Sequence, residues 1–199
     1  MKFFTLFFCL ILAGFAYSAE KKIVIIGDSL TEGYGVEKSE AFPAKLQKII
    51  KDKGHPYEVI NGGVSGSTTS SGMSRLKWFL KAKPDLIILA LGANDGLRGI
   101  KVEKSKKNLE EFILKCKKEE IPVVLAGMQI PPNYGKEYTE AFKKMYRDLV
   151  EKYDLAEIPF LIEGVAGNPE LNIEDGIHPN DEGHTIIAKN VYKHIKELL

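Results

Sequence analysis

Ser29 is the residue of this sequence best placed for chemistry. It lies in the turn 27–30 (Gly-Asp-Ser-Leu), directly after the apolar run 23–26. Such a run predicts a buried strand, which would hold the serine backbone in place while the turn exposes its hydroxyl. A serine hydroxyl is a weak nucleophile at neutral pH. It therefore needs a base, a group that orients the base, and donors for the oxyanion that develops.

A base and an acid occur together near the C-terminus, in the segment 175–179 (Asp-Gly-Ile-His-Pro). Asp175 stands three residues before His178 in a turn bounded by glycine and proline. Its carboxylate can fold back onto one imidazole nitrogen and leave the other nitrogen to face Ser29. In that arrangement the acid fixes the tautomer of the histidine, and the histidine carries the proton. The chain order Ser, Asp, His is compatible with a serine triad, because triads are defined by geometry.

The elements that must position these residues alternate between strands and helices. Short apolar runs, several of them rich in β-branched residues, predict strands at 23–26, 58–60, 86–91, 122–126 and, more weakly, 159–162. Between them, apolar residues recur at helical spacing within 42–50, 73–80, 109–116 and 142–150, and a last helix is expected from about Asn180. The alternation predicts a three-layer α/β/α sandwich with a central, mostly parallel five-stranded sheet, flavodoxin-like in class. Ligands of such sheets bind beyond the carboxyl ends of the strands, where the loops of the first three strands carry Ser29, Gly66 and Asn94.

Four blocks of the sequence resemble, in order, those of the GDSL or SGNH hydrolase family. They are the segment 27–30, Gly66 within the small-residue loop 61–68, the segment 92–95 (Gly-Ala-Asn-Asp), and the segment 175–179. The resemblance covers essentially all of the chain after residue 19. Segments 94–99 and 132–135 are further similar to the exported bacterial acyl-CoA thioesterase, arylesterase and lysophospholipase group.

The resemblance implies a role for each block. Ser29 is implied to be the nucleophile, His178 the base and Asp175 the group that orients the base. The amides of Ser29 and Gly66 and the side-chain amide of Asn94 are implied to form the oxyanion hole. Physical reasoning agrees, because one tetrahedral oxyanion is best held by several donors already in place.

Some assignments near the site stay open. Gly66 matches the family glycine through the pattern Asn-x-x-Val-Ser-Gly, with Gly63 as the alternative. Leu97, Tyr134 and Ile177 are expected to border an acyl site, because a fatty chain needs an apolar wall near the serine. Ordinary packing explains each of these three equally well.

Composition and motifs argue against other classes of protein. The 199 residues are 44% hydrophobic and 28% charged with a formal net charge of +1, which suits one soluble domain over 20–199 and gives no argument for a nucleic-acid partner. Thr31 stands where the α/β-hydrolase elbow Gly-x-Ser-x-Gly has its second glycine, which argues against that fold. The turn also lacks the pattern Gly-x-Gly-x-x-Gly, which argues against a Rossmann oxidoreductase. The remaining histidines have no partner at metal-ligand spacing, so neither a metal nor a cofactor is expected.

The N-terminus predicts a secretory signal peptide over residues 1–19. Lys2 precedes an apolar run at 3–15, too short for a comfortable membrane span, and small residues at 16–19 suit a signal peptidase. Cleavage after Ser18 or Ala19 would leave an exported chain, periplasmic or secreted, without a stable membrane span. An uncleaved anchor is the alternative. Cys116 would be the one remaining cysteine, and its place in a helical apolar stripe indicates a buried core thiol. The protein is expected to be a monomer.

The leading hypothesis is a serine esterase or thioesterase that acts through an acyl-serine intermediate on a small-molecule or lipid acyl ester. Lysophospholipid, aryl ester, fatty-acyl ester and acyl thioester are the candidate substrates. An exported enzyme would rarely meet cytoplasmic acyl-CoA, which favours an acyl ester. A carbohydrate O-deacetylase of the same family is one alternative. A non-catalytic ligand-binding relative is another, and the intact set of Ser29, Asn94, Asp175 and His178 argues against it.

Overall fold

A single five-stranded parallel sheet organises the chain. The computed structural model describes residues 21–199. The strands are β1 (Lys21–Gly27), β2 (Tyr57–Gly63), β3 (Leu86–Ala90), β4 (Val123–Ala126) and β5 (Ala156–Ile158). They lie in the order β2-β1-β3-β4-β5, and every neighbouring pair is parallel. The α/β fold class expected from the alternating pattern is therefore confirmed.

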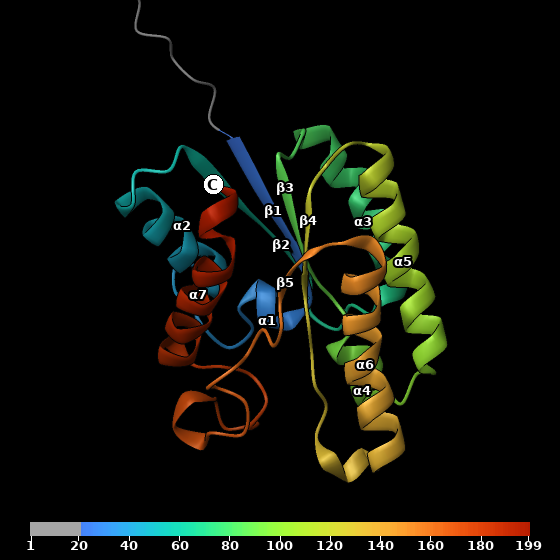
Figure 1. Cartoon of the computed structure of the whole chain (residues 1–199). Helices are drawn as coiled ribbons and strands as arrows, with labels where there is room; N and C mark the ends of the chain where they lie inside the picture. Colours follow the sequence, from blue (N-terminus) through green and yellow to red (C-terminus); the bar gives the residue numbers. More distant parts are fainter. Residues whose placement is uncertain (1–20) are drawn as a thin grey trace, which may run out of the picture.

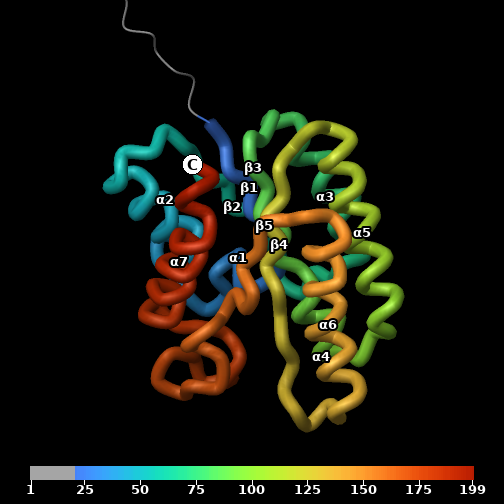
Figure 2. The backbone as a smooth tube through the Cα atoms, in the orientation of Figure 1, coloured from blue at the N-terminus to red at the C-terminus, as the bar shows by residue number. Residues whose placement is uncertain are grey.

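Helices cover both faces of this sheet, giving three layers (Figures 1 and 2). On one face lie α2 (Phe42–Asp52) and α7 (Asp181–Ile195), and on the other lie α3 (Gly72–Phe79), α5 (Val102–Lys118) and α6 (Lys136–Tyr153). Two short helices, α1 (Ser29–Glu32) and α4 (Ala93–Leu97), begin just after β1 and β3 at the carboxyl edge of the sheet. That edge is the lower side in Figure 1.

The central strands form the middle of the core. All four residues 23–26 of β1 are fully buried, and the five residues of β3 are at most 3% exposed. A strand covered by helices on both faces has no solvent side, which is why these stretches are continuously apolar rather than alternating. The rigid ends of β1 and β3 therefore give the following turns a fixed starting point.

The fifth strand differs from its expected position. The apolar run 159–162 was expected to form it, but β5 is Ala156–Ile158, and the chain leaves the sheet at Pro159. β5 is an edge strand, and its regular pairing with β4 ends here because the Gly127 amide donates to the Ile158 carbonyl while the Gly127 carbonyl accepts from Leu161, three residues further on. The predicted position was wrong, since the observed strand ends one residue before the expected one begins. As a result, Phe160 and Ile162 belong to the loop that follows the sheet edge and not to the sheet.

Helix α7 docks on α2 through a buried histidine. Its N-cap is Asn180, as expected, with the side-chain oxygen accepting from the Glu182 and Gly183 amides. One turn later, His184 is fully buried, and its Nδ1 accepts from the Phe42 amide at 3.2 Å. That amide opens α2 and has no partner within its own helix. Burial, aided by the nearby Lys45, lowers the pKa of His184 to about 4.

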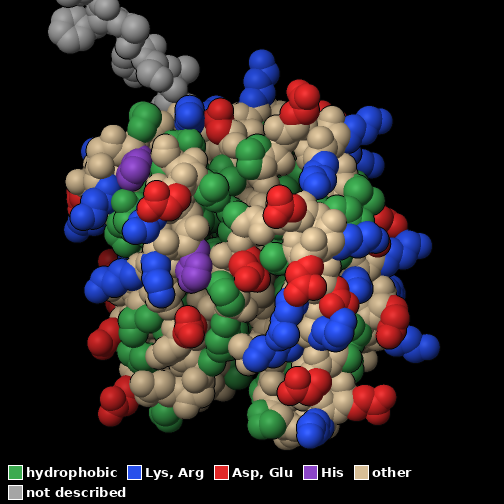
Figure 3. Space-filling view, in the orientation of Figure 1, with side chains coloured by type: hydrophobic (Ala, Val, Ile, Leu, Met, Phe, Trp, Pro, Cys, Tyr) green, Lys and Arg blue, Asp and Glu red, His purple; other side chains and the backbone are tan. Residues whose placement is uncertain are grey.

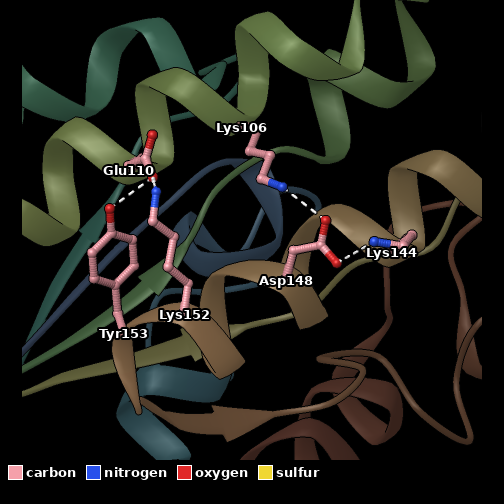
Figure 4. Close-up of polar contacts among 6 residues, drawn as sticks. All are labelled: Lys106, Glu110, Lys144, Asp148, Lys152 and Tyr153. Atoms are coloured by element: carbon pink, nitrogen blue, oxygen red, sulfur yellow. Dashed lines mark hydrogen bonds and ion pairs between the residues drawn. The ribbon is translucent and has the colours of Figure 1, made fainter.

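Helices α5 and α6 are joined on the surface by two carboxylates with two partners each (Figure 4). The contacts are Lys106 Nζ to Asp148 Oδ2 (2.7 Å), Lys144 Nζ to Asp148 Oδ1 (2.5 Å), Lys152 Nζ to Glu110 Oε1 (2.7 Å) and Tyr153 Oη to Glu110 Oε1 (2.7 Å). Exposed pairs of this kind contribute little to stability. Each helix is held against the sheet by its own buried stripe, which in α5 includes the fully buried Cys116.

The surface carries charges of both signs. In the space-filling view, lysine and arginine side chains are interspersed with aspartate and glutamate, and no large region of one sign stands out on this face (Figure 3). None of the helices within residues 21–199 combines the length and the apolar character that crossing a bilayer requires.

Candidate active site

Ser29 lies at the carboxyl end of β1, where the strand turns directly into α1. Asp28 caps this short helix, since its Oδ1 accepts from the Leu30 amide at 3.1 Å. Gly27 is required by close packing, because a Cβ there would lie 1.9 Å from Thr31 Oγ1. The Gly-Asp-Ser-Leu turn thus combines a sterically required glycine, a helix cap and a partly buried serine at the carboxyl edge of the sheet.

The serine, histidine and aspartate expected to act together do lie in contact. His178 Nε2 is 2.8 Å from Ser29 Oγ, and His178 Nδ1 is 2.6 Å from Asp175 Oδ2. Since a carboxylate only accepts, Nδ1 carries the proton that it receives, and Nε2 is left as an acceptor for the serine hydroxyl. The chain brings together residues 149 positions apart.

Asp175 is held in its ionised form by local donors. Its Oδ1 accepts from the amides of Ile177 and His178, each at 3.0 Å. Burial works against the charge, but these two amides and the imidazole outweigh it and bring the pKa of Asp175 below its usual value. The tight turn 175–178 therefore positions the carboxylate and the imidazole as one unit.

The aromatic ring of Tyr34 covers His178. The two ring centroids are 4.7 Å apart with planes inclined by 46°. Tyr34 stays half exposed at the mouth of the site. Nothing in the sequence indicated a role for Tyr34, because this contact joins two residues far apart in the chain.

Two further loops, after β2 and β3, lie at the same carboxyl edge of the sheet as the serine. Asn94 opens α4 after β3, and its Nδ2 donates to the Ser67 carbonyl at 3.1 Å. Gly66 lies in the loop after β2 with φ of +75°, a conformation that favours glycine. Within residues 21–199 the amide N–H groups of Ser29 and Gly66 make no hydrogen bond, so both are available to a ligand.

Gly63, the alternative to Gly66, is differently placed. It is the last residue of β2, opposite Gly27, and its amide already donates to Asn61 Oδ1 at 2.8 Å. A Cβ at this position would lie 2.1 Å from the Glu32 amide nitrogen. Gly63 is therefore a glycine of close packing against α1, and the available donor belongs to Gly66.

A buried aspartate next to Asn94 ties two of these loops together. Asp95 is 1% exposed, and its carboxylate accepts from the Thr69 amide (2.8 Å), the Thr69 hydroxyl (2.5 Å) and the Ser105 hydroxyl (2.8 Å). A buried carboxylate needs such donors to remain stable. The network sets α4 against the loop that carries Gly66.

An apolar cavity of about 440 Å³ opens beside Ser29 and His178. It lies at the lower edge in Figure 3, where the surface is notched between two lobes. Its walls come from four separate segments after strands. The apolar side chains among them include Leu97, Met128, Ile130, Phe160, Ile162, Ala166 and Ile177.

The three residues expected to border an acyl site are differently placed. Leu97 and Ile177 line the cavity, whereas Tyr134 is not among its lining residues. The Tyr134 hydroxyl instead donates to the Leu97 carbonyl at 2.9 Å. Tyr134 thus holds the backbone of a residue that lines the cavity without lining it itself.

Comparison with known proteins shows the family of the chain. The profile of the GDSL-like Lipase/Acylhydrolase family matches residues 25–186. The chain belongs to this family. The esterase TesA of Pseudomonas aeruginosa is 37% identical over 183 residues, which are 92% of this chain and 91% of the relative. Thioesterase 1/protease 1/lysophospholipase L1 of Escherichia coli K12 is 34% identical over 97% of this chain and 92% of its own.

The family relation extends to three dimensions. A crystal structure of TesA superposes with a TM-score of 0.86 at 37% identity, covering 90% of this chain and 100% of the other. As a GDSL-like acylhydrolase, the chain is a serine hydrolase that acts on ester bonds. Among residues 21–199, no three His, Cys, Asp or Glu side chains gather in a way that could hold a metal ion.

Proposed function

We propose that Ser29 is the nucleophile of this hydrolase, His178 its general base and Asp175 the residue that orients the base. The observation that carries this proposal is the continuous contact from Ser29 Oγ through the imidazole to the Asp175 carboxylate, at 2.8 and 2.6 Å. Both distances are within hydrogen-bonding range for proton transfer. The two ring nitrogens have the distinct roles that a triad requires.

In the first half-reaction, Ser29 Oγ attacks the acyl carbonyl carbon while His178 Nε2 takes the hydroxyl proton. The carbonyl oxygen becomes an oxyanion, held by the amides of Ser29 and Gly66 and by Asn94 Nδ2. Both backbone amides lack a partner within the described chain, which supports this role. The intermediate collapses as the alcohol or thiol leaves, taking the proton from His178 and leaving an acyl-serine.

In the second half-reaction, water replaces the leaving group. His178 takes a proton from the water, whose oxygen attacks the acyl carbon, and the same donors hold the second oxyanion. Collapse breaks the bond to Ser29 Oγ, which regains a proton from His178, and releases the carboxylic acid. Asp175 stays ionised throughout, in agreement with the donors that lower its pKa.

The substrate we propose is an ester with an apolar acyl chain, such as a lysophospholipid or another fatty-acyl ester. The apolar cavity of about 440 Å³ beside the serine supports this, with Leu97 and Ile177 in its wall. Aryl esters and acyl thioesters present the same carbonyl and are expected to react as well. The size of the cavity gives no reason to favour a carbohydrate O-deacetylase, whose acetyl group would leave most of it unfilled.

We further propose that the protein is exported and acts as a monomer. The leader at 1–19 lies outside the described residues, so this proposal rests on its charge and apolar pattern. All residues proposed to act on the substrate come from one chain, so catalysis needs no second copy. N-terminal sequencing of the protein recovered from outside the cytoplasm should give a first residue at position 19 or 20.

A chain-length series of p-nitrophenyl esters, from acetyl to palmitoyl, tests the function. We expect the chain from Glu20 onward to prefer medium or long acyl groups over acetyl, and Ser29→Ala to lose nearly all turnover. Undiminished hydrolysis by Ser29→Ala would contradict the mechanism. A preference for acetyl would support a deacetylase, and inactivity on every ester would favour a binding protein.

A further inference from the structure

Arg98 stands one helical turn after Asn94. Its backbone amide donates to the Asn94 carbonyl at 3.2 Å, closing the end of α4. Residues four apart lie on the same side of a helix, so the Arg98 side chain extends over Asn94. From there, its Nη2 donates to the Gly66 carbonyl at 3.1 Å and to Asn94 Oδ1 at 3.5 Å. One guanidinium group therefore contacts Gly66 and Asn94, two of the three residues of the proposed oxyanion hole.

The Asn94 amide has only one orientation that satisfies its neighbours. Its oxygen faces the guanidinium, which can only donate, and its nitrogen faces the Ser67 carbonyl, which can only accept. Turning the amide over would place donors against donors at one end and oxygen against oxygen at the other. In the observed orientation one hydrogen of Nδ2 is used by Ser67 and the second is left for a ligand.

The Gly66 loop is held by the same arginine. With φ of +75°, this residue depends on being glycine, and a Cβ there would lie 3.5 Å from Arg98 Nη2. The bond to its carbonyl restrains the peptide next to the free Gly66 amide. A loop of this kind, exposed and rich in small residues, would otherwise sample several conformations.

The backbone that carries Arg98 is braced from the other side. The Tyr134 hydroxyl donates to the Leu97 carbonyl at 2.9 Å, and the Tyr138 hydroxyl donates to the Ile100 carbonyl at 2.7 Å. These bonds hold the chain just before and just after Arg98. The guanidinium therefore starts from a defined position although the side chain itself is exposed.

We propose that Arg98 is a positioning residue that pre-organises the oxyanion hole by holding the Asn94 amide and the Gly66 loop at once. The proposal rests on the function proposed above for Asn94 and Gly66. Arg98 does not touch the reacting atoms. It keeps two donors aimed at the place where charge develops, so that little reorganisation is needed in the transition state.

Kinetics of Arg98→Ala and Arg98→Lys on a p-nitrophenyl ester test the proposal. For Arg98→Ala we expect kcat to fall about 10- to 100-fold with KM changed less than about threefold, as expected when a transition-state contact is lost. Arg98→Lys should be intermediate, because an ammonium is a single point donor and lacks the arginine fork. Lys101→Ala is the matched control: it removes an exposed positive charge nearby in the chain and should leave kcat unchanged.

Three further measurements separate positioning from a merely structural role. The melting temperature of Arg98→Ala should stay within about 2 °C of the wild type, since the side chain is exposed. Low guanidinium chloride, matched against sodium chloride, should restore part of the kcat of Arg98→Ala and none in Lys101→Ala. In an Asn94→Ala background, Arg98→Ala should cost clearly less than in the wild type, because the part of its effect that acts through Asn94 is already lost and only the contact with the Gly66 carbonyl remains.

Several outcomes would overturn the proposal. They are an unchanged kcat in Arg98→Ala, a rise in KM alone, which would make Arg98 a substrate contact, or an equal loss with and without Asn94, which would show that Arg98 does not act on the two donors together. Failure of the proposed function is recognised separately, by Ser29→Ala retaining activity. Only the activity that depends on Ser29 is compared among the Arg98 variants.

Discussion

Two aspartates near the nucleophile have opposite electrostatic surroundings. Burial raises the pKa of Asp28 to about 6, although the Leu30 amide and the charges of His178 and Arg75 oppose the shift. Asp175 lies at the surface among donors that outweigh its desolvation, and its pKa falls. The folded protein therefore destabilises the ionised form of Asp28, in the turn after β1, and stabilises the ionised form of Asp175, in the turn before His178.

Asp28→Asn should stabilise the protein at neutral pH. The folded-state pKa of about 6 exceeds the usual 3.8, so the ionised carboxylate lowers stability as pH rises through this interval. Asparagine keeps the oxygen that caps Leu30 and removes the charge. We expect a gain of about 1–3 kcal/mol at pH 7 that disappears near pH 4, measured by urea unfolding. A difference that does not vary with pH would contradict this account.

Substitutions in the triad should reduce turnover to different extents. His178→Ala removes the base and should lower kcat about 10⁶-fold, whereas Asp175→Asn should cost about 10⁴-fold because it leaves the base present but wrongly oriented. Steady-state ester hydrolysis measures both. Equal losses would argue against an orienting role for Asp175, and unchanged melting temperatures would show that neither variant acts through unfolding.

At the scale of elements, each short helix at the sheet edge has a partner that fixes it. Helix α1 begins at the Asp28 cap, and α4 is tied by Asp95 to the loop after β2. Helix α7 follows directly on the segment that carries His178 and docks on α2 through His184. The distance from His178 to Ser29 therefore depends on how α7 packs.

His184→Asn should flatten the loss of stability in acid. Since the folded-state pKa of about 4 lies below the usual 6.5, the stability that the neutral imidazole provides is full above pH 6.5 and is lost as pH falls towards 4. Asparagine Oδ1 can replace Nδ1 as the acceptor for Phe42 without titrating. Between pH 7 and 4 the variant should lose about 2 kcal/mol less than the wild type in chemical denaturation.

His184→Ala is the control for that experiment. It also removes the titrating group, but it leaves the Phe42 amide without an acceptor, which should cost about 1–3 kcal/mol at every pH. If His184→Asn kept the full acid loss of the wild type, the pH dependence would have to come from another group.

At the scale of the whole molecule, the cavity exists only because segments distant in sequence meet at one edge of the sheet. Residues 128–132 after β4 and residues 160–167 after β5 contribute to its lining, together with residues after β1 and β3 and the segment that carries His178. Figure 1 shows these two loops descending on either side of the sheet edge, in yellow and orange. Neither segment encloses a volume by itself.

Ala166→Phe should shorten the acyl chain that the enzyme accepts. Ala166 lines the cavity on the β5 side, and a phenyl ring there would occupy space available to a long chain. We expect kcat/KM for decanoyl and longer esters to fall about 10-fold or more, with butyryl esters changed less than about twofold. A uniform loss across chain lengths would show that the acyl chain binds elsewhere.

Much of this organisation was predictable from local sequence. Four of the five strands and every long helix follow from apolar periodicity, and the blocks around Ser29, Asn94 and His178 indicated the chemistry. The fifth strand was misplaced because the apolar run 159–162 has the composition of a strand, whereas the pairing with β4 involves the less apolar residues 156–158 before it. Arg98 lies in the segment 94–99 that resembles the family, but nothing in the sequence indicated its role, and Tyr34 gave no signal, because an exposed side chain is unremarkable until its partners are known.

Local sequence was enough to predict the alternation of strands and helices, the class of the fold and the kinds of groups at the strand ends, because these depend on periodicity and side-chain chemistry within short windows. The folded structure was needed to show that Gly66 rather than Gly63 has a free amide, that Leu97 and Ile177 but not Tyr134 line the cavity, and that one arginine contacts both Asn94 and Gly66. These features are distances between residues far apart in the chain, and such distances are set by how the helices pack on the sheet.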